Sequence, residues 1–183
     1  MAKRELVTAP SGDVVNIATL AAHLRIDARD EDDVLHDLLT EAVTAVEDYT
    51  RRVLLTQTWD QCYDDFDDPL VLAVQPVASI TSVTYLDSNG ASQTLATSVY
   101  ELGSENGTPV VRRKYDQDWP VTRDHKDVVI VRYVAGYGDP ADVPDSLTKA
   151  VRIHAAWNHR HREGEPIPDG FYHLLSPYKV RHT

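Results

Sequence analysis

The strongest constraint in the sequence is an apolar repeat that begins at Val34 and ends at Tyr49. Its apolar side chains recur at steps of three and four residues, the spacing that brings them to one face of an α-helix. This face carries Leu35, Leu38, Leu39, Ala42, Val46 and Tyr49. Acidic residues 30–33 precede the repeat, where Asp30 can cap the helix and the helix dipole favours negative charge. We therefore expect an amphipathic helix. Its opposite face, which should contact water or a partner, carries Asp37, Glu41, Thr44 and Asp48.

Further helices are expected near both ends of the chain. Residues 14–24 show helical spacing, and a second such stripe begins after Pro144 and ends near His161. Proline suits the first turn of a helix, because the backbone N–H that it lacks has no partner there. Residues 163–170 then form a loop, and residues 171–183 a short helical turn with a basic tail. The stripes are Ile17, Leu20, Ala21 and Leu24 in the first helix, and Leu147, Ala150, Val151, His154 and Trp157 in the later one.

The middle of the chain changes to the two-residue period of β-strands. Residues 54–66 alternate as a strand that places Leu55, Gln57, Trp59 and Gln61 on one side. Prolines at positions 69 and 76 keep the next segment near a sheet edge. Two β-prone runs within residues 79–95 flank Asn89 and Gly90, a pair that tolerates positive φ, so we expect a hairpin there. Further short strands are expected at residues 100–102, 110–113 and 128–133.

These patterns together predict an α+β fold, in which a small and mostly antiparallel sheet is inserted into a helical core. We expect a single domain over residues 1–183. Its parts are a helical stretch at 14–50, a β-rich insertion at 54–134, and a C-terminal helix with a docking tail at 144–183. Residues 103–126, with Trp119 and Pro120, are weakly patterned, and we expect a long surface loop there. An insertion that contacts a neighbouring copy is the alternative, and the first twelve residues match no pattern.

Composition and charge narrow the class of protein. The 183-residue chain has a formal net charge of −11, whereas a protein that grips DNA by its phosphates needs a large basic face. Its single cysteine, Cys62, excludes an internal disulfide and a four-cysteine metal site. The N-terminal residues lack the apolar core of a signal peptide, and no apolar run approaches the roughly 20 residues of a membrane span. We expect a soluble protein of a reducing cytoplasm, without a membrane partner.

Histidines crowd the end of the last long helix, at His154, His159 and His161. Metal ligands must converge on one point, and on a helix they lie three or four residues apart. His154 and His161 are two turns apart, while His159 and His161 diverge by about 200° at the helical period. We therefore expect His154 against the core, and the other two beside Arg160 and Arg162 at the negative end of the helix dipole. Metal binding or catalysis by these histidines is the weaker alternative.

No other group of residues has the pattern of a catalytic site. The acidic clusters at residues 30–33 and 64–68 suit a helix start and a loop, and the second lacks the glycine of a calcium loop. Neither a GxSxG motif nor a phosphate-binding glycine motif occurs, and Cys62 has no histidine at a recognisable spacing. We therefore expect no catalytic residue, no metal and no cofactor.

Four stretches of the chain, in their order, resemble one known family. They are EDYTRRVLLTQTW at residues 47–59, PVASITSVTYLDSNG at 76–90, VRYVAGYGDPADVPDSLTKAV at 131–151 and LLSPYKVRH at 174–182. From about Ile17 onward the chain resembles the head–tail connector, or adaptor, proteins of tailed phages and of phage-derived gene transfer particles. It is similar to the longer members of this family, which carry a β insertion between helices.

The resemblance implies a structural protein of the virion neck and not an enzyme. Such proteins form a ring, typically twelve-fold, beneath the portal of a DNA-filled head. The implied partners are the portal protein, the next neck or tail-completion protein, and further copies of the chain. The ring leaves a central channel, and an acidic ring would let DNA slide through without specific binding. Assembly is implied in the cytoplasm of a bacterial host, with a free monomer before assembly as one alternative.

The C-terminal segment is the expected docking site, because this region commonly contacts the portal in members of the family. Tyr178, Lys179 and Arg181 combine an aromatic anchor with positive charge, as interface hot spots often do. Two other functions stay open. One is a small metal-dependent or hydrolytic enzyme that uses the histidine-rich helix end, and the other is a DNA-binding packaging factor, which the charge disfavours. The sequence also leaves open the copy number of the ring, the host, the choice between phage and gene transfer agent, and the face that lines the channel.

Overall fold

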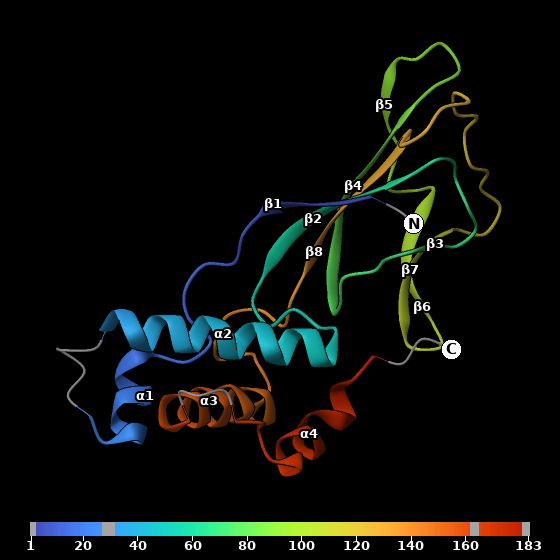
Figure 1. Ribbon diagram of the computed structural model, residues 1–183. Helices are drawn as coiled ribbons and strands as arrows, with labels where there is room; N and C mark the ends of the chain where they lie inside the picture. Colours follow the sequence, from blue (N-terminus) through green and yellow to red (C-terminus); the bar gives the residue numbers. More distant parts are fainter. Residues whose placement is uncertain (1–2, 27–31, 162–164, 181–183) are drawn as a thin grey trace. The chain divides into compact units, whose positions relative to one another are not determined.

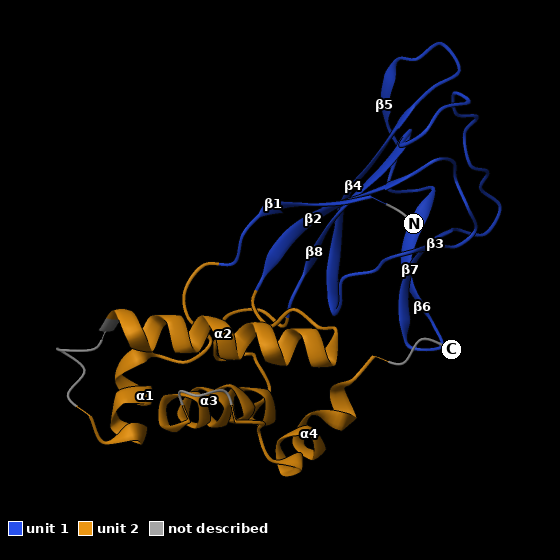
Figure 2. Ribbon diagram, in the orientation of Figure 1, with its two compact units in different colours: residues 1–10, 56–136 blue, residues 11–55, 137–183 orange. Residues whose placement is uncertain are grey.

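The computed structural model describes residues 3–26, 32–161 and 165–180 (Figure 1). Asp30, the expected helix cap, and Arg181, an expected docking residue, lie outside the described residues. The chain divides into two compact units, shown in different colours in Figure 2. The β unit consists of residues 1–10 and 56–136, and the helical unit of residues 11–55 and 137–183. The expected α+β class is confirmed by these helices and antiparallel sheets.

The helical unit encloses one apolar core. Its described elements are α1 (Ile17–Leu24), α2 (Asp32–Thr50), α3 (Asp145–Arg160), α4 (Asp169–Leu175) and the 3₁₀ turn η2 (Ser176–Tyr178). Helix α2 buries the stripe expected from its sequence, including Leu35, Leu39 and Val46, and α3 packs on it with Leu147 and Val151. Both helices are polar on their other face, so packing stripe against stripe removes the apolar side chains from water. Within the described ranges, no helix has the length and apolarity that crossing a membrane requires.

Helix α1 begins later than its apolar pattern predicted. Its first residue is Ile17, because the Asn16 side chain caps the helix and accepts a hydrogen bond of 2.8 Å from the N–H of Ala18. Val14 and Val15 lie before this cap and are nevertheless buried in the core. The apolar spacing of residues 14–24 therefore reports core contacts that extend beyond the helix itself.

The β unit contains two antiparallel sheets where the sequence predicted one. The larger sheet has the strand order β1-β2-β8-β4-β5 and the smaller sheet the order β3-β7-β6. The larger sheet consists of β1 (Arg4–Thr8), β2 (Gln57–Tyr63), β8 (Val129–Ala135), β4 (Val77–Leu86) and β5 (Ser92–Thr94). The smaller sheet consists of β3 (Leu70–Val71), β7 (Thr108–Arg113) and β6 (Tyr100–Glu105). Strand β8 is central, and its alternate residues Val129, Val131, Tyr133 and Ala135 are buried.

Two parts of the β unit differ from the sequence-based expectation. The first twelve residues, which matched no pattern, contain β1, and this strand pairs with β2. The short strands expected at residues 100–102 and 110–113 are present as parts of β6 and β7, but the long loop expected at residues 103–126 is wrong over its first half, because these strands form a hairpin there. The hairpin turns at Asn106 and Gly107, with φ of 50° and 81°. An Asn-Gly pair is a strong hairpin signal, so the sequence contained the clue. Residues 114–128 form the remaining connection from β7 to β8.

The hairpin expected within residues 79–95 is confirmed as β4 and β5. Asp87 closes its turn, because the carboxylate accepts hydrogen bonds from the N–H groups of Asn89 at 2.9 Å and Ala91 at 3.0 Å. A hydrogen bond from the Gln93 side chain, together with these backbone bonds, holds the pKa of Asp87 below its usual value. Gly90 adopts a φ of 81°, which glycine reaches without the steric cost of a Cβ atom.

Buried polar side chains connect the larger sheet to β3 of the smaller one. Gln61, only 2% exposed, donates from Nε2 to the Val71 carbonyl at 2.8 Å, and its Oε1 accepts from the Ala73 N–H at 3.0 Å. The Tyr133 hydroxyl also donates to this Oε1 at 3.2 Å, and the Tyr63 hydroxyl donates to the Val71 carbonyl at 2.7 Å. Burial raises the pKa of Tyr133 to about 12, so the hydroxyl keeps its proton. Every buried polar atom of Gln61 thus has a partner, as a buried amide requires.

Candidate interaction surfaces

The segment that follows α4 is folded back onto the end of α2. The N–H of Val180 donates to the Thr50 carbonyl at 3.0 Å, and Arg52 Nε donates to the Tyr178 carbonyl at 2.7 Å. Lys179 Nζ lies 4.5 Å from the centre of the Tyr49 ring, which is a cation–π contact. Because the last carbonyls of a helix lack intrahelical partners, the Val180 bond also completes the end of α2. The C-terminal segment is therefore fixed to the helical unit.

Two of the three expected docking residues are described by the structure. Tyr178 is partly buried against the helical core, while Lys179 is exposed. The exposed Tyr172 of α4 lies beside the same helix end, with its ring centre 5.1 Å from that of Tyr49. Sequence reasoning missed Tyr172, because an aromatic residue in a short apolar helix resembles a core residue. The candidate surface therefore combines aromatic rings with a lysine on a rigid support.

Glu47 and Thr50 build the helix end that receives this segment. The buried Thr50 hydroxyl donates to the Val46 carbonyl at 2.7 Å. The Glu47 carboxylate accepts a 2.7 Å hydrogen bond from the N–H of Leu54 and so holds the chain as it leaves the helix. Burial raises the pKa of Glu47, the Leu54 bond acts in the opposite direction, and the nearby Asp48 adds to the rise.

A pocket of about 500 Å³ opens in the helical unit, beside the histidine-rich end of α3. It is lined by Leu38, Glu41, His154, Asn158, His161, Glu165, Ile167 and Tyr172. Imidazole and carboxylate groups meet here, so the alternative enzymatic function would have to use this pocket. Of the three crowded histidines, the pocket wall includes two and leaves out His159.

The histidines of this pocket are held by separate contacts. The His161 ring stacks on Trp157 at 3.8 Å, and its Nε2 lies 3.6 Å from a carboxylate oxygen of Glu165. The His154 ring packs against Phe171, with 5.5 Å between ring centres. Across the residues that the structure describes, no three His, Cys, Asp or Glu side chains form a group that could hold a metal ion. The arrangement is that of a helix end packed by aromatic side chains.

Burial lowers the pKa of His154, and the opposing Glu41 carboxylate offsets only part of this effect. The pKa of this imidazole is then lower in the folded chain than in the unfolded chain, where it is about 6.5. Protonation therefore favours unfolding. The stability that the neutral imidazole contributes is complete above about pH 6.5 and is lost as the pH falls below that value.

We expect His154→Leu to reduce the pH dependence of stability. Thermal unfolding of the wild-type chain and of the variant should be compared between about pH 7.5 and about pH 5. The midpoint of the wild type should fall more on acidification, because leucine cannot take up a proton. His125→Leu, which removes an exposed histidine of the β unit, is the matched control and should leave the pH dependence unchanged. If acidification lowered the unfolding midpoint equally in the wild type and in His154→Leu, the pH dependence could not be assigned to His154.

Comparison with known families gives a match over part of the chain. Residues 15–101 match the family described as Phage gp6-like head-tail connector protein. This stretch contains α1, α2, the strands β2 to β5 and the start of β6, while β1 lies before it. None of the curated proteins compared with the chain matches it.

Solved structures share the fold over nearly the whole chain. A chain from the neck of an empty GTA particle, computed with C6 symmetry, is 22% identical with a TM-score of 0.83, covering 99% of this chain and 97% of its own. A chain from the virion of a native gene transfer agent (GTA) particle is 24% identical with a TM-score of 0.81, covering 98% and 96%. A chain from the neck of a native GTA particle, computed with C12 symmetry, is 22% identical with a TM-score of 0.79, covering 99% and 97%. At these identities the likeness is evidence of a common fold.

Proposed function

We propose that the chain is a structural connector in the neck of a tailed particle. The premise is that the chain belongs, over residues 15–101, to the phage gp6-like head–tail connector family. The family match is the observation that carries this function. The fold supports it, because chains in the necks of GTA particles share it over 99% of this chain. The connector acts by joining a head to a tail through contacts between proteins.

In the particle, copies of the chain form a ring. The two neck structures with this fold were computed with C6 and C12 symmetry, which both describe subunits repeated around an axis. We favour twelve copies, the number typical of the family. Each copy in a ring uses two different surfaces, one for each neighbour, because the contacts are head-to-tail.

The C-terminal segment of each copy docks on the portal protein. Tyr178, Lys179 and Arg181 are the residues assigned to this contact, and Tyr172 extends the same surface. Support comes from the contacts that fix Tyr178 and Lys179 on the end of α2. A segment that is already ordered loses less conformational entropy on binding than a free tail. The next neck or tail-completion protein binds the ring at a different surface.

The charge of the chain suits a channel for DNA. The net charge is −11, and repetition around a ring multiplies it. A wall of the same sign as DNA repels the phosphates and so lets the duplex pass without adhesion. We propose that the genome crosses the ring without specific contacts to this protein.

We also propose that the chain is not an enzyme. A hydrolytic or metal-dependent enzyme would have to use the pocket beside Glu41 and His154, and no observation favours this alternative over packing of a helix end. A connector needs no turnover, because its function is complete once the particle is joined.

The test is to remove the chain from cells that produce the particle. DNA-filled heads and separate tails should accumulate, and joined particles should disappear from electron micrographs. Expression of the wild-type chain from a second copy of the gene should restore joining, and the number of heads provides the control for particle production. Joined particles at the wild-type level without the chain would refute the proposed function.

A further inference from the structure

The β unit has an aromatic side chain that does not pack against the rest of the fold. Residues 114–121, which follow β7, are called the braced loop below. Tyr115 in this loop is 99% exposed and is the most exposed of the large apolar side chains that the structure describes. Val121, near the far end of the loop, is 78% exposed. Burying an aromatic ring stabilises an interface strongly, so two such residues in one loop indicate a surface for a partner.

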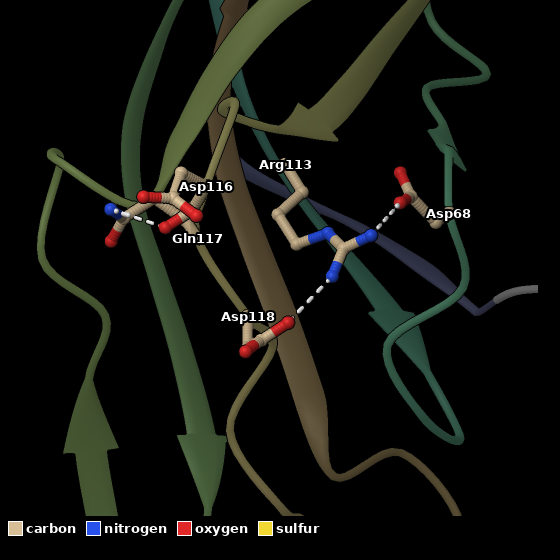
Figure 3. Close-up of polar contacts among 5 residues, drawn as sticks. All are labelled: Asp68, Arg113, Asp116, Gln117 and Asp118. Carbon is tan, nitrogen blue, oxygen red and sulfur yellow. Dashed lines mark hydrogen bonds and ion pairs between the residues drawn. The ribbon is translucent and has the colours of Figure 1, made fainter.

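An arginine fixes the start of the loop. Figure 3 shows the Arg113 guanidinium between two carboxylates that come from different segments of the chain. Its Nη1 lies 2.9 Å from Oδ1 of Asp118, and its Nη2 lies 3.4 Å from Oδ2 of Asp68. The same view shows the Gln117 side chain, whose Nε2 donates to the Asp116 carbonyl at 3.0 Å. The loop is therefore tied to the segment before β3.

Stacked rings fix the other end of the loop. Trp119 lies parallel to Phe66, with 4.8 Å between ring centres and 7° between ring planes. The Thr122 hydroxyl then donates to the Asp65 carboxylate at 2.8 Å, and the N–H of Arg123 donates to the Leu86 carbonyl at 3.0 Å. The backbone between these two supports is thus held in place while Tyr115 points into solvent. An ordered loop with an unburied tyrosine is preorganised for binding, because little entropy remains to be lost.

A surface of complementary chemistry lies on β1 of the same unit. This strand forms the edge of the larger sheet, so one side of its backbone has no neighbouring strand among the residues that the structure describes. Arg4 and Leu6 are two residues apart and so lie on one face of the strand. Leu6 is 42% exposed, and Arg4 forms no ion pair with any residue that the structure describes. The edge therefore combines an aliphatic side chain with a positive charge that no described acidic residue pairs with.

We propose that the braced loop of one copy docks on strand β1 of the next copy in the ring. Tyr115 and Val121 cover Leu6, and the Asp116 carboxylate pairs with Arg4. The signs of the two charges are opposite, and Asp116 has no ion-pair partner among the described residues. This inference rests on the proposed ring, and it names the two different surfaces that a head-to-tail contact needs.

Crosslinking inside assembled particles tests the contact directly. The native thiol is first removed by Cys62→Ser, and Leu6→Cys and Tyr115→Cys are then introduced together or singly. A short bifunctional maleimide should convert the double variant into a ladder of oligomers that ends in a closed ring. The single variants are the matched controls and should stay monomeric, because identical positions do not meet in a head-to-tail contact. Joined particles of the double variant that yield no crosslinked chain would overturn the inference.

A substitution without cysteine covers the case in which the crosslinking variants do not assemble. Tyr115→Ser should reduce the yield of joined particles about tenfold or more, as the loss of a tyrosine hot spot does. The isolated Tyr115→Ser chain should unfold at the same temperature as the wild type, because the aromatic ring of Tyr115 contacts only solvent in the single chain. Val71→Ser removes another exposed apolar side chain of the β unit, 48% exposed, and should leave the yield unchanged.

The two proposals fail in different ways. Wild-type yield from Tyr115→Ser refutes the docking of the loop and leaves the connector function intact. Normal joining in cells that lack the whole chain refutes the connector function itself.

Discussion

Replacement of Gln61 by leucine should destabilise the β unit by about 2 to 4 kcal/mol, since each buried polar group left without a partner costs about 1 to 3 kcal/mol. The carboxamide links three groups: the Val71 carbonyl, the Ala73 N–H and the Tyr133 hydroxyl. Leucine has a similar volume but can neither donate nor accept a hydrogen bond. The Val71 carbonyl keeps the hydroxyl of Tyr63, so the loss falls mainly on Ala73 and Tyr133.

The measurement is hydrogen exchange of the backbone amides of β8, the central strand of the larger sheet. Protection of these amides reports the free energy of opening of the unit that contains them. Gln57→Leu is the matched control, because Gln57 is also buried on β2 but accepts one side-chain hydrogen bond, from Trp59 Nε1 at 3.2 Å. Gln57→Leu should lower the free energy of opening by less than half as much as Gln61→Leu does. Equal protection in wild type and Gln61→Leu would show that the network does not hold the sheets together.

Truncation of the chain after Leu175 should abolish binding to the portal. The truncation removes Tyr178, Lys179 and Arg181, which are the residues assigned to docking. It also removes the two hydrogen bonds to the end of α2 and the cation–π contact with Tyr49. Losing these contacts should cost about 1 to 3 kcal/mol, which is less than the total stability of an ordinary domain. The shortened chain should therefore remain folded while it fails to bind.

Binding is measured with purified portal protein, and folding with thermal unfolding of the same samples. Truncation after Val180 is the control, because it removes only residues 181–183 and keeps the described contacts of the segment. Weakened binding by this control would assign part of the affinity to Arg181. Undiminished binding by the chain that ends at Leu175 would remove the docking assignment, whatever its effect on stability.

The helices could be predicted because their information is local. The stripe from Leu35 to Val46 has one period throughout, and only a helix brings all its members to one face. The β4–β5 hairpin was predictable for a similar reason, since its turn chemistry lies within a few residues at Asp87 and Gly90. Short strands were expected at residues 100–102 and 110–113, where β6 and β7 lie, but their pairing as a hairpin was missed although Asn106 and Gly107 carry the same turn signal.

The candidate surfaces were harder to predict, because they depend on residues that are distant in sequence. Lys179 and Tyr178 were predicted as docking residues from their residue types, yet Lys179 also contacts Tyr49 at the end of α2, and Tyr178 contacts Arg52, which follows that helix. The braced loop looked like weakly patterned chain, and its order comes from Asp68 and Phe66, which precede it by about fifty residues. No local period reports such contacts.

The sequence by itself determined the α+β class, the apolar faces of the helices, the acidic charge and the resemblance to head–tail connector proteins. These properties follow from residue type and spacing, which are present before folding. Only the tertiary structure decided that Gln61 is a buried link and that Tyr115 is left in solvent on a rigid loop. The reason is that the burial and the hydrogen-bond partners of a side chain depend on which distant segments pack around it. Two glutamines or two tyrosines with similar sequence neighbours can therefore have very different surroundings.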